Sequence, residues 1–156
     1  MAQGTVVLAG SLPVERLALD HLVAEFGWSL KAAGSLRGVA ALNADHNLVA
    51  VLFSPRGLAL PWEQALRGIL NAAPEALPIL CQGFSDAIHW PKVVAAGGFH
   101  SLFLPFHMGE VRQSLGFVWD AKCRAASISI CRDPHPRTVV REQTLAGGTS
   151  SARNVA

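Results

Sequence analysis

Apolar residues in the first 123 positions alternate between short continuous runs and stretches with helical spacing. The short runs are typical of buried strands. The stretches between them repeat at i, i+3, i+4 and i+7, as on the buried face of a helix; Leu19, Leu22, Val23 and Phe26 are one example. The runs predict strands at residues 5–9, 28–33, 48–53, 79–81 and 100–104.

The run at 48–53 has six apolar residues and no polar one. A strand with no polar face has to be covered on both sides, as in the middle of a parallel sheet. Strand and helix patterns that alternate in this way predict parallel strands with right-handed crossovers. The sequence therefore predicts an α/β fold of the (βα)5 type: a three-layer α/β/α sandwich, flavodoxin-like, with a five-stranded parallel sheet in the order 2-1-3-4-5. Any site is expected at the carboxyl ends of the strands.

Turn and cap residues set the expected limits of the elements. Ser35 is expected to cap the second helix, and Asp86 to cap the fourth helical segment. Residues 54–57, Ser-Pro-Arg-Gly, are expected to form a turn. Pro78 is expected to lie just ahead of the fourth strand, and the fifth helix should cover about residues 108–122.

The length of 156 residues and the hydrophobic fraction of 51% suit one domain with a substantial core. Charge is uneven, because residues 1–123 carry eight Lys or Arg against nine Asp or Glu, and residues 124–156 carry five against two. We therefore expect a near-neutral domain at 1–123 and a basic, partly disordered C-terminal extension at 124–156. Residues 127–130 would either extend the fifth helix or pair with 138–141 as a hairpin.

Composition also argues against a membrane or exported protein. A membrane span needs about 18 uninterrupted apolar residues, and no segment comes close to that length. The N-terminus has no basic stretch ahead of its apolar one, as a signal peptide would. Cys81, Cys123 and Cys131 are odd in number and lack CxxC spacing, which favours reduced thiols. The expected location is the cytoplasm.

Three patterns, in this order and spacing, resemble the receiver domain of bacterial response regulators over about residues 4–122. The first is VVLAGSLP at 6–13, and the second is NLVAVLFSPRG at 47–57. The most specific is AGGFHSLFLPF at 96–106, which Glu110-Val111 follows. The resemblance implies two-component-type signal transduction, and it implies that the peptide bond before Pro105 is cis.

In that family, phosphoryl transfer uses two acids that hold Mg²⁺, an acceptor Asp, a Ser or Thr, and a Lys before a proline. By the resemblance, the acids fall on Gly10 and Ser11, and the acceptor falls on Leu52. The Ser or Thr falls on Gln82 and the Lys on Leu104. None of the five is kept, so the site has no carboxylate for the metal and no cation for the phosphoryl group. We predict a degenerate site in which the two leucines pack together.

The resemblance also implies where a partner would bind. Receivers usually dock and dimerise through the face formed by their fourth helix, fifth strand and fifth helix. The apolar residues expected on or near this face are Trp90, Val94, Phe99, Phe103 and Met108. Most such residues belong to a core, so only the exposed members of this set would form a patch.

No motif indicates a cofactor, a metal ion or an enzyme active site. The six histidines form neither HxH nor HExxH, and no GxGxxG or GxxxxGK[ST] is present. The expected strand ends carry no paired acids and no nucleophile beside a base. The chain is therefore not expected to be an enzyme.

Two functions stay open from the sequence. The favoured one is a degenerate, phosphorylation-independent receiver that binds a protein partner or a second copy through the face just described. The alternative is an atypical response regulator whose basic extension at 124–156 binds nucleic acid, although a net charge of +2 is too small to indicate this alone.

Overall fold

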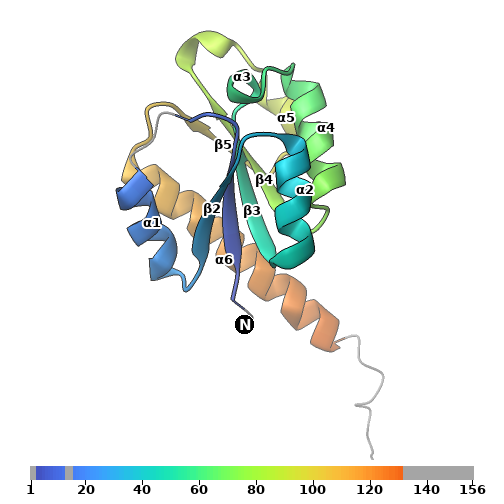
Figure 1. The fold of residues 1–156 in the computed structure, drawn as a ribbon. Coiled ribbons are helices and arrows are strands. Elements are labelled where there is room, and N and C mark those ends of the chain that lie inside the picture. The colour runs from blue at the N-terminus through green and yellow to red at the C-terminus, as the bar shows by residue number, and fades with distance from the viewer. Residues whose placement is uncertain (1–2, 13–15, 132–156) are drawn as a thin grey trace, which may run out of the picture. The chain divides into compact units, whose positions relative to one another are not determined.

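The computed structural model describes residues 3–12 and 16–131, and for 127–131 the backbone only. The strands are β1 (Thr5–Ala9), β2 (Ser29–Ala33), β3 (Leu48–Phe53), β4 (Leu77–Gln82) and β5 (His100–Phe103). All pair in parallel in one sheet of order β2-β1-β3-β4-β5 (Figure 1). The predicted fold class and strand order are confirmed.

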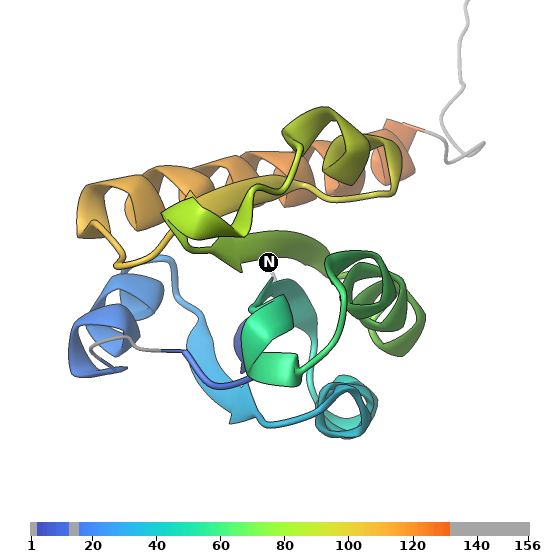
Figure 2. The ribbon, with the colours of Figure 1, turned by 90° about the horizontal axis from the view of Figure 1, so that it is seen from above.

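Helices cover both faces of the sheet. They are α1 (Arg16–Glu25), α2 (Leu36–Asp45), α3 (Pro55–Leu58), α4 (Trp62–Ala72), α5 (Trp90–Ala95) and α6 (Met108–Cys131), with one turn of 3₁₀-helix, η1 (Phe84–Asp86). Figure 2 shows the resulting three layers. α1 and the part of α6 up to Asp120 pack on one face of the sheet, and α2, α4 and α5 pack on the other.

The central strand β3 contributes to the core on both faces. All six of its residues are buried, and alternate side chains point to opposite faces. Leu52 is fully buried in the core on the side of α1 and α6, whereas Phe53 is fully buried on the side of α2 and α4. Cover on both sides explains the unbroken apolar run at 48–53.

Two short segments differ from the prediction. Residues 54–57 are not a simple turn, because α3 begins there with Ser54 as its N-cap. The Gly57 N–H donates to the Ser54 Oγ at 3.0 Å. Proline at the first helical position suits a helix start as well as a turn, so Pro55 does not distinguish the two. Pro78 lies inside β4, as its second residue, rather than ahead of the strand.

α6 continues beyond its expected end. It runs to Cys131 rather than to about residue 122, so residues 127–130 extend the helix instead of starting a hairpin. The chain divides into two units, Met1–Asp120 and Ala121–Ala156. The basic extension beyond Cys131 lies outside the described residues, and so does any hairpin partner there. None of the helices described is both long enough and apolar enough to cross a membrane.

Candidate functional site

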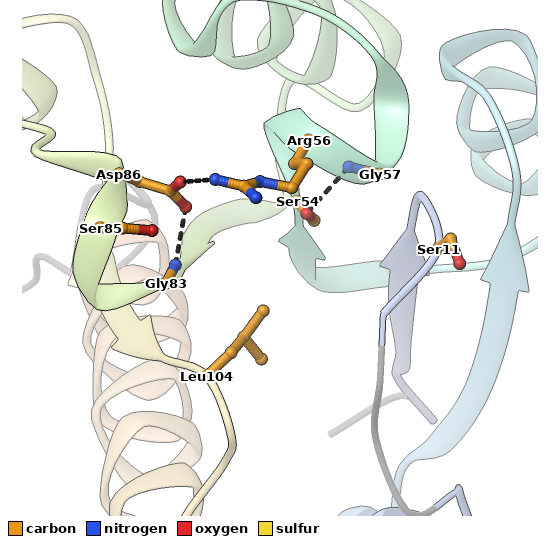
Figure 3. A pocket seen from close by; sticks show the side chains of 8 residues that line it. All are labelled: Ser11, Ser54, Arg56, Gly57, Gly83, Ser85, Asp86 and Leu104. Carbon is orange, nitrogen blue, oxygen red and sulfur yellow. Dashed lines mark hydrogen bonds and ion pairs between the residues drawn. The ribbon is translucent and has the colours of Figure 1, made fainter.

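A pocket of about 400 Å³ opens at the edge of the sheet where β1, β3, β4 and β5 end (Figure 3). Parallel strands bring their carboxyl ends to one edge, and this class of fold binds its ligands there. Each of the four strands contributes a residue that follows its end. The lining residues are Ser11, Ser54, Arg56, Gly57, Gly83, Ser85, Asp86 and Leu104.

Two of the five positions assigned by the resemblance, Ser11 and Leu104, line this pocket. Leu52 is fully buried in the hydrophobic cluster against which Leu104 packs, so both leucines belong to the same core. Gln82 is buried, and the next residue, Gly83, is the one that follows β4 into the pocket. The peptide bond that follows Leu104 is cis, which confirms that prediction.

The fifth position, Gly10, lies where the backbone of α3 meets the end of β1. Its φ of 89° is in the left-handed region. A Cβ on Gly10 would lie 3.0 Å from the carbonyl carbon of Gly57 and 3.1 Å from the carbonyl oxygen of Ser54. A Cβ on Gly57 would lie only 2.5 Å from the carbonyl oxygen of Ser11. A side chain at position 10 would therefore press on the backbone of α3, which would have to move by a few tenths of an ångström.

Asp86 is the acidic residue of the pocket, and its carboxylate is already bound. Its Oδ2 accepts from the Gly83 N–H at 2.7 Å, and its Oδ1 pairs with the Arg56 guanidinium (Figure 3). The backbone hydrogen bond first, and then Arg56, hold the pKa of Asp86 below its usual range. Asp86 does not cap the fourth helical segment as predicted: it ends η1, and α5 begins later, at Trp90, with His89 as its N-cap.

The pocket offers little for phosphoryl transfer or acid–base catalysis. Its lining has three serines but no histidine, lysine or cysteine to activate them. Ser54 is only 5% exposed, and its Oγ accepts the hydrogen bond from Gly57. Nowhere in residues 3–12 and 16–131 do three His, Cys, Asp or Glu side chains gather in a way that would hold a metal ion.

A second feature is a group of exposed apolar side chains in η1, α5, β5 and α6. Phe84 is 79% exposed and Val94 is 49% exposed. Phe103 is stacked on Phe84, with ring centroids 4.8 Å apart. Phe117 is 43% exposed and is stacked on His100, with ring centroids 5.5 Å apart. The side of the domain at β5 therefore carries most of the large apolar side chains that the described surface exposes.

The face predicted from the sequence is only partly exposed. Val94 and Phe103 are exposed, as a docking surface requires. Trp90, by contrast, is half-buried against the core on the side of α4. Phe99 and Met108 are half-buried against the core on the side of α1. These three residues complete the cores and contribute less to the surface than expected.

Sequence reasoning missed Phe84, Phe117 and the Arg56–Asp86 ion pair. Helical spacing contains a signal for Phe117, because it lies directly before the inward-facing Val118 and so falls on the flank of α6. No local pattern marks Phe84, which begins the single 3₁₀ turn η1. The ion pair joins residues 30 positions apart, so only the fold brings it together.

No protein-family model and no curated protein matches the chain. Solved structures do match it. The signal receiver domain of an HD domain-containing protein from Pseudomonas fluorescens Pf-5 is 20% identical, with a TM-score of 0.61, over 80% of this chain and 95% of that one. A CheY-like response regulator receiver domain protein from Methanospirillum hungatei JF-1 is 12% identical, with a TM-score of 0.62, over 80% of this chain and 99% of that one.

The match to NtrX from Brucella abortus is 16% identical, with a TM-score of 0.68, and covers 85% of this chain but only 30% of NtrX. Identities this low show the fold alone. Together with the strand order, they show that the chain has the fold of a response regulator receiver domain. The resemblance seen in the sequence is confirmed at that level.

Proposed function

We propose that this chain is a degenerate receiver of two-component-type signalling, which works by protein–protein contact and independently of phosphorylation, and is not an enzyme. The observation that carries the proposal is the backbone contact between Gly10 and Gly57. It would place a Cβ at position 10 only 3.0–3.1 Å from backbone atoms of residues 54–58, which is tighter than ordinary van der Waals contact. The site therefore lacks the acid, and α3 would have to shift to accept one.

The electrostatics of the pocket support the same proposal. Phosphoryl transfer depends on a metal ion and a cation that neutralise the transferring group. Leu52 and Leu104 provide two apolar side chains where the family has an acceptor and a cation. The remaining carboxylate, on Asp86, is held by Gly83 and Arg56. Mg²⁺ prefers several free oxygen ligands, and this arrangement offers few.

The interaction face, defined here by Val94, Phe103 and Phe117, is where we propose that a partner binds. Lys92 on α5 and Asp120 on α6 are exposed, and neither forms an ion pair with another described residue. A two-fold symmetric pair in which α5 of one copy lies against α6 of the other would bring these opposite charges together. A second copy is the partner that this charge pattern favours.

The first test is phosphorylation by a small-molecule donor. We expect acetyl phosphate and Mg²⁺ to leave the intact mass of the protein unchanged, because Gly10, Ser11 and Leu52 supply no carboxylate. A receiver domain that keeps its acceptor Asp, treated in the same tube, is the positive control. A stable gain of one phosphoryl group that requires Mg²⁺ would contradict the proposal.

The second test concerns the interaction face. Phe117→Asp should weaken self-association at least about tenfold, because it places a charge within the proposed contact. Leu17→Asp is the matched control, since Leu17 is 65% exposed on α1, away from the face. Sedimentation equilibrium of the three proteins gives the dissociation constants. Equal constants for both variants would be evidence against this face.

A wild-type chain that stays monomeric would exclude the second copy and leave a different protein as the partner. A photo-crosslinker at position 117 should then capture that protein, and one at position 17 should not. Capture at neither position would overturn the proposed interaction face.

The alternative of nucleic-acid binding through the basic extension gains no support from the fold, because residues 132–156 lie outside the described residues. Its signature would be binding to polyanions that weakens steeply as salt is added.

A further inference from the structure

The pocket at the carboxyl ends of the strands has two charged side chains, one exposed to solvent and the other mostly covered. The Arg56 side chain is 75% exposed, whereas that of Asp86 is 17% exposed. Both Asp86 oxygens already accept hydrogen bonds. Within the described part of the chain, the bond to Asp86 is the only hydrogen bond of the Arg56 side chain, so its other N–H donors are available. The mouth of the pocket therefore offers donors to an outside acceptor.

The rest of the lining is apolar or weakly polar. The Leu104 side chain points into the pocket in Figure 3, and Gly57 and Gly83 line it with bare backbone. Ser11 and Ser85 are both exposed and carry hydroxyl groups. The volume of about 400 Å³ suits a small molecule rather than a polymer. The Arg56 guanidinium at the mouth of the pocket and the Leu104 side chain inside it match a ligand in which an anionic group is attached to an apolar one.

We propose that this pocket binds a small carboxylate that carries a compact apolar group such as a ring. The carboxylate would pair with the available donors of Arg56, whose planar guanidinium suits two parallel hydrogen bonds. The apolar group would contact Leu104, and the Ser85 hydroxyl would donate to the carboxylate. This ligand site does not rest on the proposed protein contact, so either can fail without the other.

The existing ion pair does not block such a ligand. The Arg56 half of the ion pair is exposed, so solvent screens the pair and Arg56 can turn from Asp86 toward a ligand at a modest cost. The Gly83 N–H keeps its hydrogen bond to Asp86 when this happens. The Asp86 charge thus stays partly satisfied while the guanidinium changes partner.

Titration with phenylacetate, followed by amide NMR, tests the proposal on the full chain. We expect saturable shifts at Gly83, Ser85 and Leu104, with a dissociation constant of about 1–10 mM, as for a well-placed fragment of this size. Acetate lacks the apolar group and phenylacetamide lacks the charge, so each should bind at least about fivefold more weakly. Equal binding of phenylacetamide, or unchanged pocket amides at about 20 mM phenylacetate, would overturn the proposal.

Two arginine variants complete the test. Arg56→Met should weaken phenylacetate binding about fivefold or more, because it removes the charge and keeps much of the aliphatic stem. Arg37→Met, at another exposed arginine on α2, should bind as the wild type does. The exposure of both residues means that both variants should fold, which the spread of the amide resonances checks. If Arg56→Met bound phenylacetate as tightly as the wild type does, Arg56 would not recognise the carboxylate and the proposal would be wrong.

Discussion

Two glycines hold the end of β1 against α3 in this domain. Gly10 adopts a φ of 89°, where a side chain costs about 1–2 kcal/mol, and its Cα faces the backbone of α3. Gly57 approaches still more closely, because a Cβ there would meet the Ser11 oxygen at 2.5 Å. An Asp in place of Gly10 would crowd α3 before it could bind a metal ion. The glycine and the short helix therefore depend on each other.

We expect Gly10→Ala to destabilise the domain more than Gly27→Ala. Gly27 has a φ of 77°, so both changes put a Cβ in the left-handed region, but nothing lies within 4 Å of a Cβ at Gly27. Gly27→Ala should cost about 1–2 kcal/mol from backbone strain alone. Gly10→Ala should cost about 1–3 kcal/mol more, from crowding. Urea denaturation measures both free energies of unfolding.

Equal losses for the two variants would show that α3 moves aside at no cost. The close backbone approach at Gly10 would then not exclude a metal-binding acid at that position. The unfolding slope, m, should stay the same in all three proteins, since a change in m would mean that a different amount of surface is exposed on unfolding.

Among the strands and helices, those that are specified by their own residues and immediate neighbours could be predicted from the sequence. β3 appears as six apolar residues and is buried at all six. α2 begins after Ser35, whose Oγ accepts from the Gly38 N–H at 3.2 Å, as an N-cap residue does. The alternation of such elements also specified the parallel sheet, because right-handed crossovers leave few topologies to choose from.

Elements that depend on distant contacts could not be predicted. η1 is tied to α3 by Arg56 and Asp86, and nothing local in either segment points to the other. The register of β4 against β5 decides which residue reaches the edge of the sheet, and it places Gly83 there, just beyond Gln82. The sequence therefore predicts only that the five functional side chains of the family are absent from the site. The pocket and its exposed guanidinium emerge only from the fold.

For the domain as a whole, the two leucines that the resemblance assigns to the acceptor and cation positions contribute to the core. Leu52 is fully buried between the sheet and the helices α1 and α6, and Leu104 packs against the same cluster. Burial of one such side chain stabilises a domain by about 1.5–3 kcal/mol. An Asp and a Lys in these places would need a metal ion or each other to offset their loss of water. The two leucines need neither and add to the packing of the core.

Leu52→Asp should therefore lower the free energy of unfolding by about 3–5 kcal/mol at neutral pH, because it buries a carboxylate without a partner. Asn has nearly the shape of Asp but carries no charge. Leu52→Asn therefore measures the loss of apolar volume alone, and its difference from Leu52→Asp measures the effect of the charge. Burial raises the pKa of the new carboxyl above its value in the unfolded chain. The additional loss of stability in Leu52→Asp, relative to Leu52→Asn, then has its full size above the raised pKa. It disappears as the pH falls below about 3.9.

A double variant tests whether the two positions still face each other. Leu104→Lys adds a cation at the end of β5, so the variant with both changes should lose less stability than the two single losses added together. Thermal and urea unfolding of the two single variants and the double variant gives this coupling directly. Additive losses would mean that the two side chains do not meet. If Leu52→Asp cost no more than Leu52→Asn at every pH, the carboxylate would not be buried, and the assignment of Leu52 to the acceptor position would be wrong.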